Sequence, residues 1–169
     1  MLVATSYVLA VIASIIHLLV SKTPRSRRRV VEILLLYQMV FVVAVGGTIA
    51  FYGHVFIPDQ IAKSIGWPTG SPFQYEVGMA DGAFGFLGWI CIFRRGLFWW
   101  ATGLSFSFFM IGDGVGHIIR LIQDHDFAPN NAGMVVPDIA ASALLIGFLV
   151  ALHLITRREE AASAEVATE

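Results

Sequence analysis

Residues 112–117, with the sequence GDGVGH, place an aspartate and a histidine four residues apart within an apolar stretch. On a helix, residues at i and i+4 project from one face about 6 Å apart, so the side chains of Asp113 and His117 are expected to be neighbours on one helical face. Imidazole combined with carboxylates suits divalent Zn, Mn or Fe. The same pair also suits a proton or ion relay, or a structural hydrogen bond between helices. The sequence leaves these three interpretations open.

Three other carboxylates, Glu76, Asp81 and Asp138, lie within long apolar stretches or at their ends. A carboxylate at the centre of a membrane span costs about 2.5–3.5 kcal/mol on insertion scales, so such groups are hypotheses for a functional site. Glu76 and Asp138 each come early in their stretch, where the dipole of a helix also stabilises a carboxylate. For these two residues a helix-end role and a site role both stay open.

Two secondary candidates accompany them. Arg120 lies three residues after His117, on the same side of a helix, where it is expected to neutralise Asp113. His54 ends an apolar stretch, where it would either lie on the surface or approach the same region from outside.

The elements that must position these groups are membrane-spanning helices. Of the 169 residues, 57% are hydrophobic and only 14% are charged, against about 25% charged in a soluble domain. Windows of roughly 20 apolar residues span a bilayer. Five qualify: Leu2–Val20, Val30–Phe51, Tyr75–Phe93, Leu97–His117 and Met134–Ile155. The prediction is an all-α polytopic membrane helix bundle of about five transmembrane helices, comprising residues 1–156, with a cytoplasmic polar tail, 157–169.

The basic residues predict the orientation of these spans. Lys and Arg collect at the cytoplasmic ends of membrane helices. Nine basic residues fall on one side when the spans alternate: Lys22, Arg25, Arg27, Arg28, Arg29, Arg94, Arg95, Arg157 and Arg158. Only Lys63 and Arg120 fall on the other side. The distribution favours an N-out, C-in multi-pass protein of the inner (cytoplasmic) membrane.

This orientation brings the ionisable groups to one depth. Glu76 and Asp81 come early in a span that runs inward, and Asp138 comes early in another. Asp113 and His117 come late in a span that runs outward. All five are therefore expected in the outer half of the bundle, where three helices can contribute to one polar site.

Small residues are expected to bring these helices close together. The predicted packing positions are Gly78, Gly82, Gly85, Gly112 and Gly116. Asp81 shares a helical face with the first and third of these glycines, so it is expected to point into the bundle and not toward lipid.

The first outer loop, residues 52–74, is expected to contain a short interfacial helix beginning at Pro58. Ile57, Ile61 and Ile65 would share one face of it, either on the membrane surface or as a lid over the bundle. No internal repeat, nucleic-acid motif, phosphate-binding loop or serine-nucleophile elbow is evident. These absences argue against an ordinary soluble enzyme or a DNA-binding protein.

Several stretches resemble a family of small bacterial integral membrane proteins of unknown function, over most of residues 40–155. They are GWP at 66–68, SPFQYEVG at 71–78, GDGVGH at 112–117 and APNNAG at 128–133. A Gly-Trp-Pro loop before a glutamate that opens a glycine-rich span is more remotely similar to the DoxX group. That group includes a membrane subunit of thiosulfate:quinone oxidoreductase and usually has four spans. Neither resemblance supplies a catalytic residue.

Three functional hypotheses follow. The first is a membrane metal-binding protein, either a metalloenzyme or a metal carrier, that uses a divalent Zn, Mn or Fe ion. The second is a proton- or cation-coupled transporter of small molecules. The third is a non-catalytic accessory membrane subunit of a quinone-linked oxidoreductase. In each case the expected partners are the lipid bilayer and either further copies of the chain or other membrane subunits, with no nucleic acid.

Overall fold

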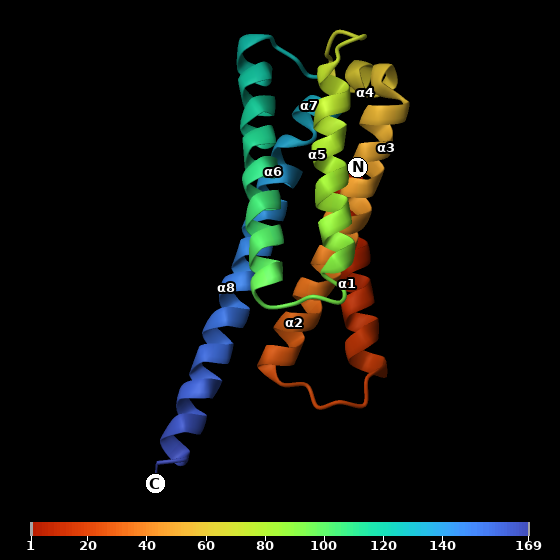
Figure 1. The fold of residues 1–169 in the computed structure, drawn as a ribbon. Coiled ribbons are helices and arrows are strands. Elements are labelled where there is room, and N and C mark those ends of the chain that lie inside the picture. Colours follow the sequence, from red (N-terminus) through yellow and green to blue (C-terminus); the bar gives the residue numbers. More distant parts are fainter. Residues whose placement is uncertain (1, 169) are drawn as a thin grey trace.

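The computed structural model describes the backbone of residues 2–168 and the side chains of residues 5–168, and this part of the chain is helical without strands (Figure 1). The predicted all-α class is therefore confirmed. The elements are α1 Leu2–Val20, α2 Arg27–Gln38, the π-helical segment η1 Met39–Val45, α3 Gly46–Phe56, α4 Pro58–Ile65, α5 Phe73–Ile90, α6 Leu97–Gln123, α7 Pro129–Ala132 and α8 Val135–Val166.

Three helices are long and apolar enough to cross a membrane: Arg27–Phe56, Leu97–Gln123 and Pro129–Val166. The first joins α2, η1 and α3 into 30 residues. At 1.5 Å per residue it is about 45 Å long, more than the roughly 30 Å of a bilayer core. The apolar part of α1, Thr5–Val20, is shorter. The 18-residue α5 occupies the remaining predicted window.

The bundle contains two helical hairpins, one formed by α3 and α5 and the other by α6 and α8. These are the most extensive helix pairings in the structure. The α3–α5 pairing is close enough to require glycine. A Cβ added to Gly47 would lie 2.7 Å from the backbone nitrogen of Gly85, and one added to Gly85 would lie 2.8 Å from that of Thr48. Gly78 and Gly82 also lie against α3 side chains. The glycines of α5 therefore hold its polar face against α3.

Two of the predicted packing glycines behave differently. Gly112 and Gly116 have no atom within 4 Å of an added Cβ, so the expectation that they allow close helix packing is wrong. Gly114 makes the close contact instead, since its Cβ would lie 3.0 Å from Ile139 on α8. At 3.6 residues per turn, positions two residues away lie about 200° around the helix, and so they face away from α8.

The hydrophobic core lies between the hairpins and is centred on α2, η1, α6 and α8. Trp99 is its largest fully buried side chain, and its indole nitrogen donates to the carbonyl of Cys91 at 2.8 Å. At the end of the bundle where α2 begins, Arg95 pairs with Glu32, and Arg28 pairs with Glu159 at 3.6 Å. The predicted polar tail continues α8 as far as Val166.

At the opposite end of the bundle α4 lies at the end of α3 (Figure 1) and packs against α7. Pro58 opens α4, as the sequence predicted, and Gly66 ends it with φ +88°. Ile61 and Ile65 turn inward to line a cavity, and Asn130 of α7 donates to the hydroxyl of Ser64 at 3.0 Å. Of the two arrangements that the sequence left open, α4 therefore has that of a lid.

Candidate metal centre

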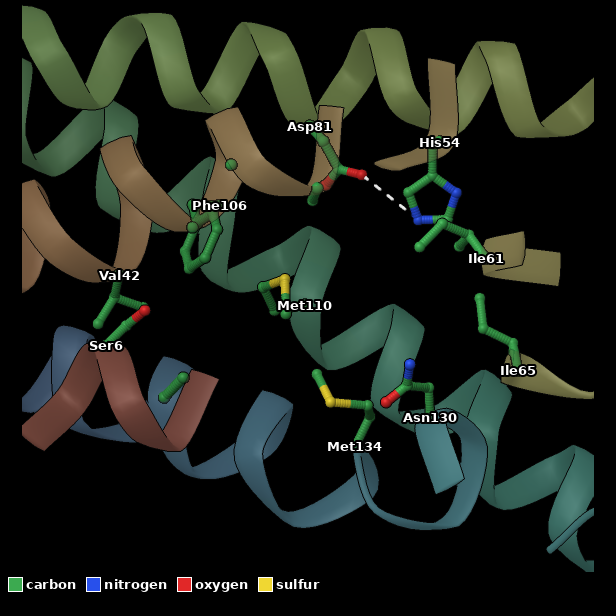
Figure 2. A pocket seen from close by; sticks show the side chains of 14 residues that line it. Ser6, Val42, His54, Ile61, Ile65, Asp81, Phe106, Met110, Asn130 and Met134 are labelled. Atoms are coloured by element: carbon green, nitrogen blue, oxygen red, sulfur yellow. Dashed lines mark ion pairs between the residues drawn. The ribbon is translucent and has the colours of Figure 1, made fainter. Parts of the chain in front are cut away.

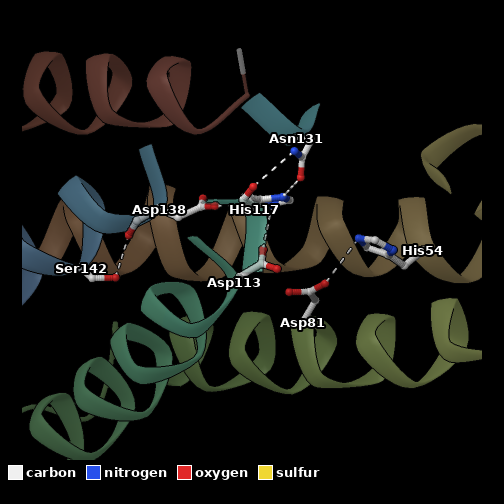
Figure 3. A network of polar contacts seen from close by, with 7 residues as sticks. All are labelled: His54, Asp81, Asp113, His117, Asn131, Asp138 and Ser142. Atoms are coloured by element: carbon white, nitrogen blue, oxygen red, sulfur yellow. Dashed lines mark hydrogen bonds and ion pairs between the residues drawn. The ribbon is translucent and has the colours of Figure 1, made fainter. Parts of the chain in front are cut away.

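Three ionisable side chains from two helices meet near the lid (Figure 3). Nε2 of His117 on α6 lies 3.6 Å from Oδ2 of Asp113, one turn earlier on the same helix. It lies 3.8 Å from Oδ2 of Asp138, in the first turn of α8. One ligand atom from each residue lies within 4.8 Å of the other two, a separation at which they could hold a metal ion.

Asn131 of α7 sets the orientation of the His117 ring. Its amide nitrogen donates to the carbonyl of Asp126 at 2.8 Å, which turns Oδ1 toward the ring. Nδ1 of His117 lies 2.6 Å from this oxygen and must carry a proton to donate to it. In the neutral imidazole, the lone pair is then on Nε2 and is directed at the two carboxylates. This arrangement, with one ring nitrogen donating to a carbonyl oxygen, is usual for a metal-ligating histidine.

Asp138 is the least solvated of the three residues. Its side chain is 0% exposed, and neither of its carboxylate oxygens has a hydrogen-bond partner. Ser142 hydroxyl donates to the backbone carbonyl of Asp138 at 2.9 Å, so it does not satisfy the carboxylate. A buried carboxylate without hydrogen bonds is costly unless a cation neutralises it.

The spacing of the donor atoms agrees with coordination to one small ion. Zinc binds imidazole nitrogen and carboxylate oxygen at about 2.0–2.2 Å, which puts neighbouring ligands of a tetrahedron about 3.4 Å apart. The two distances from His117, 3.6 and 3.8 Å, exceed this value by little. Carboxylate oxygens of Asp113 and Asp138 also lie within 4.8 Å of each other, and the side chain of Asp113 is 41% exposed.

The exposed side of Asp113 gives the cluster an opening. Asp113, Gly112 and Gly116 line a groove of about 1060 Å³ between α5 and α6, together with aromatic residues such as Phe84 and Phe108. Because the two glycines have no side chains, the groove reaches the α6 backbone beside the carboxylate. The groove therefore leads to the cluster from this side.

A second histidine–aspartate pair lies between α3 and α5. Nε2 of His54 is 4.0 Å from Oδ2 of Asp81, and Nδ1 of His54 is 2.6 Å from Oε1 of the buried Gln74. His54 and Asp81 line a cavity of about 200 Å³ whose other walls are largely apolar and include Phe106 and Met110 (Figure 2). The carboxylates of Asp81 and Asp113 are close enough to repel each other, so the two polar pairs are neighbours (Figure 3).

The remaining sequence-predicted candidates lie elsewhere. Glu76 is exposed on the first turn of α5 and is outside the cluster. Arg120 pairs with Asp124 at 2.7 Å, where both side chains are at least half exposed, and not with Asp113 as expected. Asp124, four residues after Arg120 and just beyond the end of α6, accepts from the guanidinium instead. Asn131 and Gln74, whose side-chain oxygens lie 2.6 Å from Nδ1 of the two histidines, were not predicted from the sequence.

Fold and site together define a helical-bundle protein, with helices apolar enough to cross a membrane and a histidine–carboxylate cluster that could bind a metal. The chain belongs to DUF6790, a family of unknown function, whose model matches residues 1–159. This confirms the expected membership of an uncharacterised family. The comparison does not show the remoter link to DoxX, which stays a prediction. No curated protein and no solved structure matches the chain.

Proposed function

We propose that Asp113, His117 and Asp138 bind one divalent Zn, Mn or Fe ion within the membrane, and that binding it is the central function of the protein. The observation that carries the proposal is Asp138, a fully buried carboxylate whose two oxygens lack hydrogen bonds while the imidazole of His117 faces it. A bound cation neutralises the two carboxylates and accepts the lone pair of His117. Without it, two carboxylates share a single imidazole.

The type of site supports a metalloenzyme or a carrier more than a purely structural ion. Structural zinc sites are closed by four protein ligands, whereas catalytic sites have three and keep one position open. The three residues here, with the groove beside Asp113, match the open type. Water or a substrate atom from the groove would complete the coordination of the metal.

The proposed setting is the cytoplasmic membrane, with five spans, the N-terminus outside and the C-terminus inside. Two observations support this topology. The nine clustered basic residues all fall on one side when α1, α2–α3, α5, α6 and α8 alternate. The ends of α2 and α8 that carry Arg28 and Glu159 also lie side by side. The lid and the metal centre would then belong to the outer half.

Elemental analysis of protein purified in mild detergent without chelator tests the proposal. The native protein should contain close to one Zn, Mn or Fe per chain, and His117→Ala should lose it because too few donors remain. His153→Ala is the matched control, since this histidine packs against Trp100 and lies outside the cluster. A folded native protein without metal would refute the proposal and favour a proton relay or a structural network.

A further inference from the structure

The two hairpins carry the same sequence pattern. Each has a Gly-His pair near the end of its first long helix, then proline, an amide two residues after the proline, and aspartate seven residues after the amide. The two copies are Gly53-His54, Pro72, Gln74 and Asp81, and Gly116-His117, Pro129, Asn131 and Asp138. No internal repeat was evident from the sequence alone, and this pattern suggests one. The interval from histidine to amide is 20 residues in one copy and 14 in the other, which conceals the match at any fixed period.

The geometry repeats with the sequence. In both copies Nδ1 of the histidine lies 2.6 Å from the side-chain oxygen of the amide. In both, Nε2 faces Oδ2 of the aspartate, at 4.0 Å for His54 and Asp81 and at 3.8 Å for His117 and Asp138. In both copies the histidine thus has an amide oxygen at Nδ1 and a carboxylate oxygen at Nε2.

The helices that carry the two copies have the same connectivity. α3 and α6 run toward the lid end, a short helix (α4 or α7) follows each of them, and α5 and α8 run back (Figure 1). The proline and the amide of the pattern lie at the start of α5 in one copy and in α7 in the other. Repeats that share one direction are related by an axis along the bundle, as in parallel-repeat membrane proteins. The His54 pair therefore occupies the position in its hairpin that the His117 pair occupies in the other.

One ligand distinguishes the two copies. Asp113 precedes His117 by four residues, and the residue four before His54 is Ala50. Ala50 lines the same cavity as His54 and Asp81. Its methyl group stands where the His117 copy has the carboxylate of Asp113. The cavity of about 200 Å³ leaves room for several waters of roughly 30 Å³ each to serve as the remaining ligands.

We propose that His54 and Asp81 form a second, weaker binding site for a divalent cation, equivalent by internal duplication to the site of His117 and lacking one protein ligand. Water in the cavity completes its coordination. This site shares no residue with the first one and goes beyond the proposed function. Its affinity should be at least about tenfold lower, since even the loss of a residue that only orients a ligand costs about 10–100-fold.

The test is Zn²⁺ titration of metal-stripped protein in detergent by calorimetry. The native chain should bind two ions, one tightly and one weakly. His54→Ala should remove only the weak event and His117→Ala only the tight one, whereas His153→Ala should retain both. Because the two histidines report separately, loss of the weak event alone supports this proposal even if the tight site proves absent.

The gain-of-ligand variant Ala50→Asp sharpens the test. It should tighten the weak event by at least about tenfold, because it restores the carboxylate at the position of Asp113. A folded Ala50→Asp protein with unchanged binding would overturn the proposal. So would a weak event that persists in His54→Ala, a result that remains informative if Ala50→Asp fails to fold.

Discussion

Replacing Asp138 by asparagine should have opposite effects on stability with and without metal. The change removes one charge and keeps the shape of a side chain that is 0% exposed and has no hydrogen bond on either oxygen. Without a cation, Asp138 and Asp113 share the imidazole of His117, at 3.8 and 3.6 Å, so at least one negative charge is uncompensated.

The magnitudes follow from this arrangement. A buried charge without its partner costs about 3–5 kcal/mol, and a buried amide without hydrogen bonds costs about 1–3 kcal/mol. In the metal-free protein, Asp138→Asn should therefore raise the free energy of unfolding by about 2 kcal/mol. Metal at 100 times its Kd should stabilise the native protein by about 2.7 kcal/mol, and the variant hardly at all. Metal should raise the native Tm by about 5–10 °C.

The assay is thermal unfolding in detergent, followed by circular dichroism with either chelator or Zn²⁺ present. Glu76→Gln is the control, because it removes a carboxylate that is exposed and outside the cluster. An Asp138→Asn protein that gains as much from metal as the native protein would refute the reasoning. A metal-free variant that is markedly less stable than the native protein would show that the Asp138 charge is already neutralised.

Three further predictions concern the residues around the site and the topology. Asn131→Leu should weaken metal binding by about 10–100-fold in a titration, because His117 loses the acceptor that orients it; unchanged affinity would mean that the ring is held by packing. Gly85→Ala should cost about 1–3 kcal/mol, since its Cβ meets α3 backbone at 2.8 Å, whereas Gly112→Ala should be neutral or stabilising by up to about 1 kcal/mol. Equal unfolding midpoints for the two variants would contradict the packing described. A cysteine at Thr69 should react with an impermeant thiol reagent from outside intact cells and one at Ser163 should not; the reverse pattern would overturn the N-out topology.

The sequence predicted the helices well because apolar windows report directly on burial in lipid or protein. The start of the lid helix at Pro58 was also predictable, since proline suits the first turn. The π-helical segment η1 was not, because nothing in its run of apolar residues distinguishes it from α-helix.

The site was predictable in part. Spacing on one helix brought Asp113 beside His117, and depth within the bundle placed Asp138 and Asp81 nearby. Asn131 was not predicted because an asparagine shortly after a proline is typical of a turn. Only the fold directs its side-chain amide toward the His117 ring. The inward face of α6 was also misjudged, because Gly112, Gly114 and Gly116 alternate around the helix and only the position of α8 shows that Gly114 faces it.

The most direct test of the metal centre is X-ray absorption spectroscopy at the edge of the metal found in the purified protein. We expect a first coordination shell of nitrogen and oxygen only, at about 2.0–2.2 Å. When only the site of His117 is filled, the outer-shell scattering should be that of one imidazole. His117→Ala should remove the imidazole signal or the metal itself. A first shell that contains sulfur, or an imidazole signal that persists unchanged in His117→Ala, would contradict the assignment of Asp113, His117 and Asp138 as the ligands.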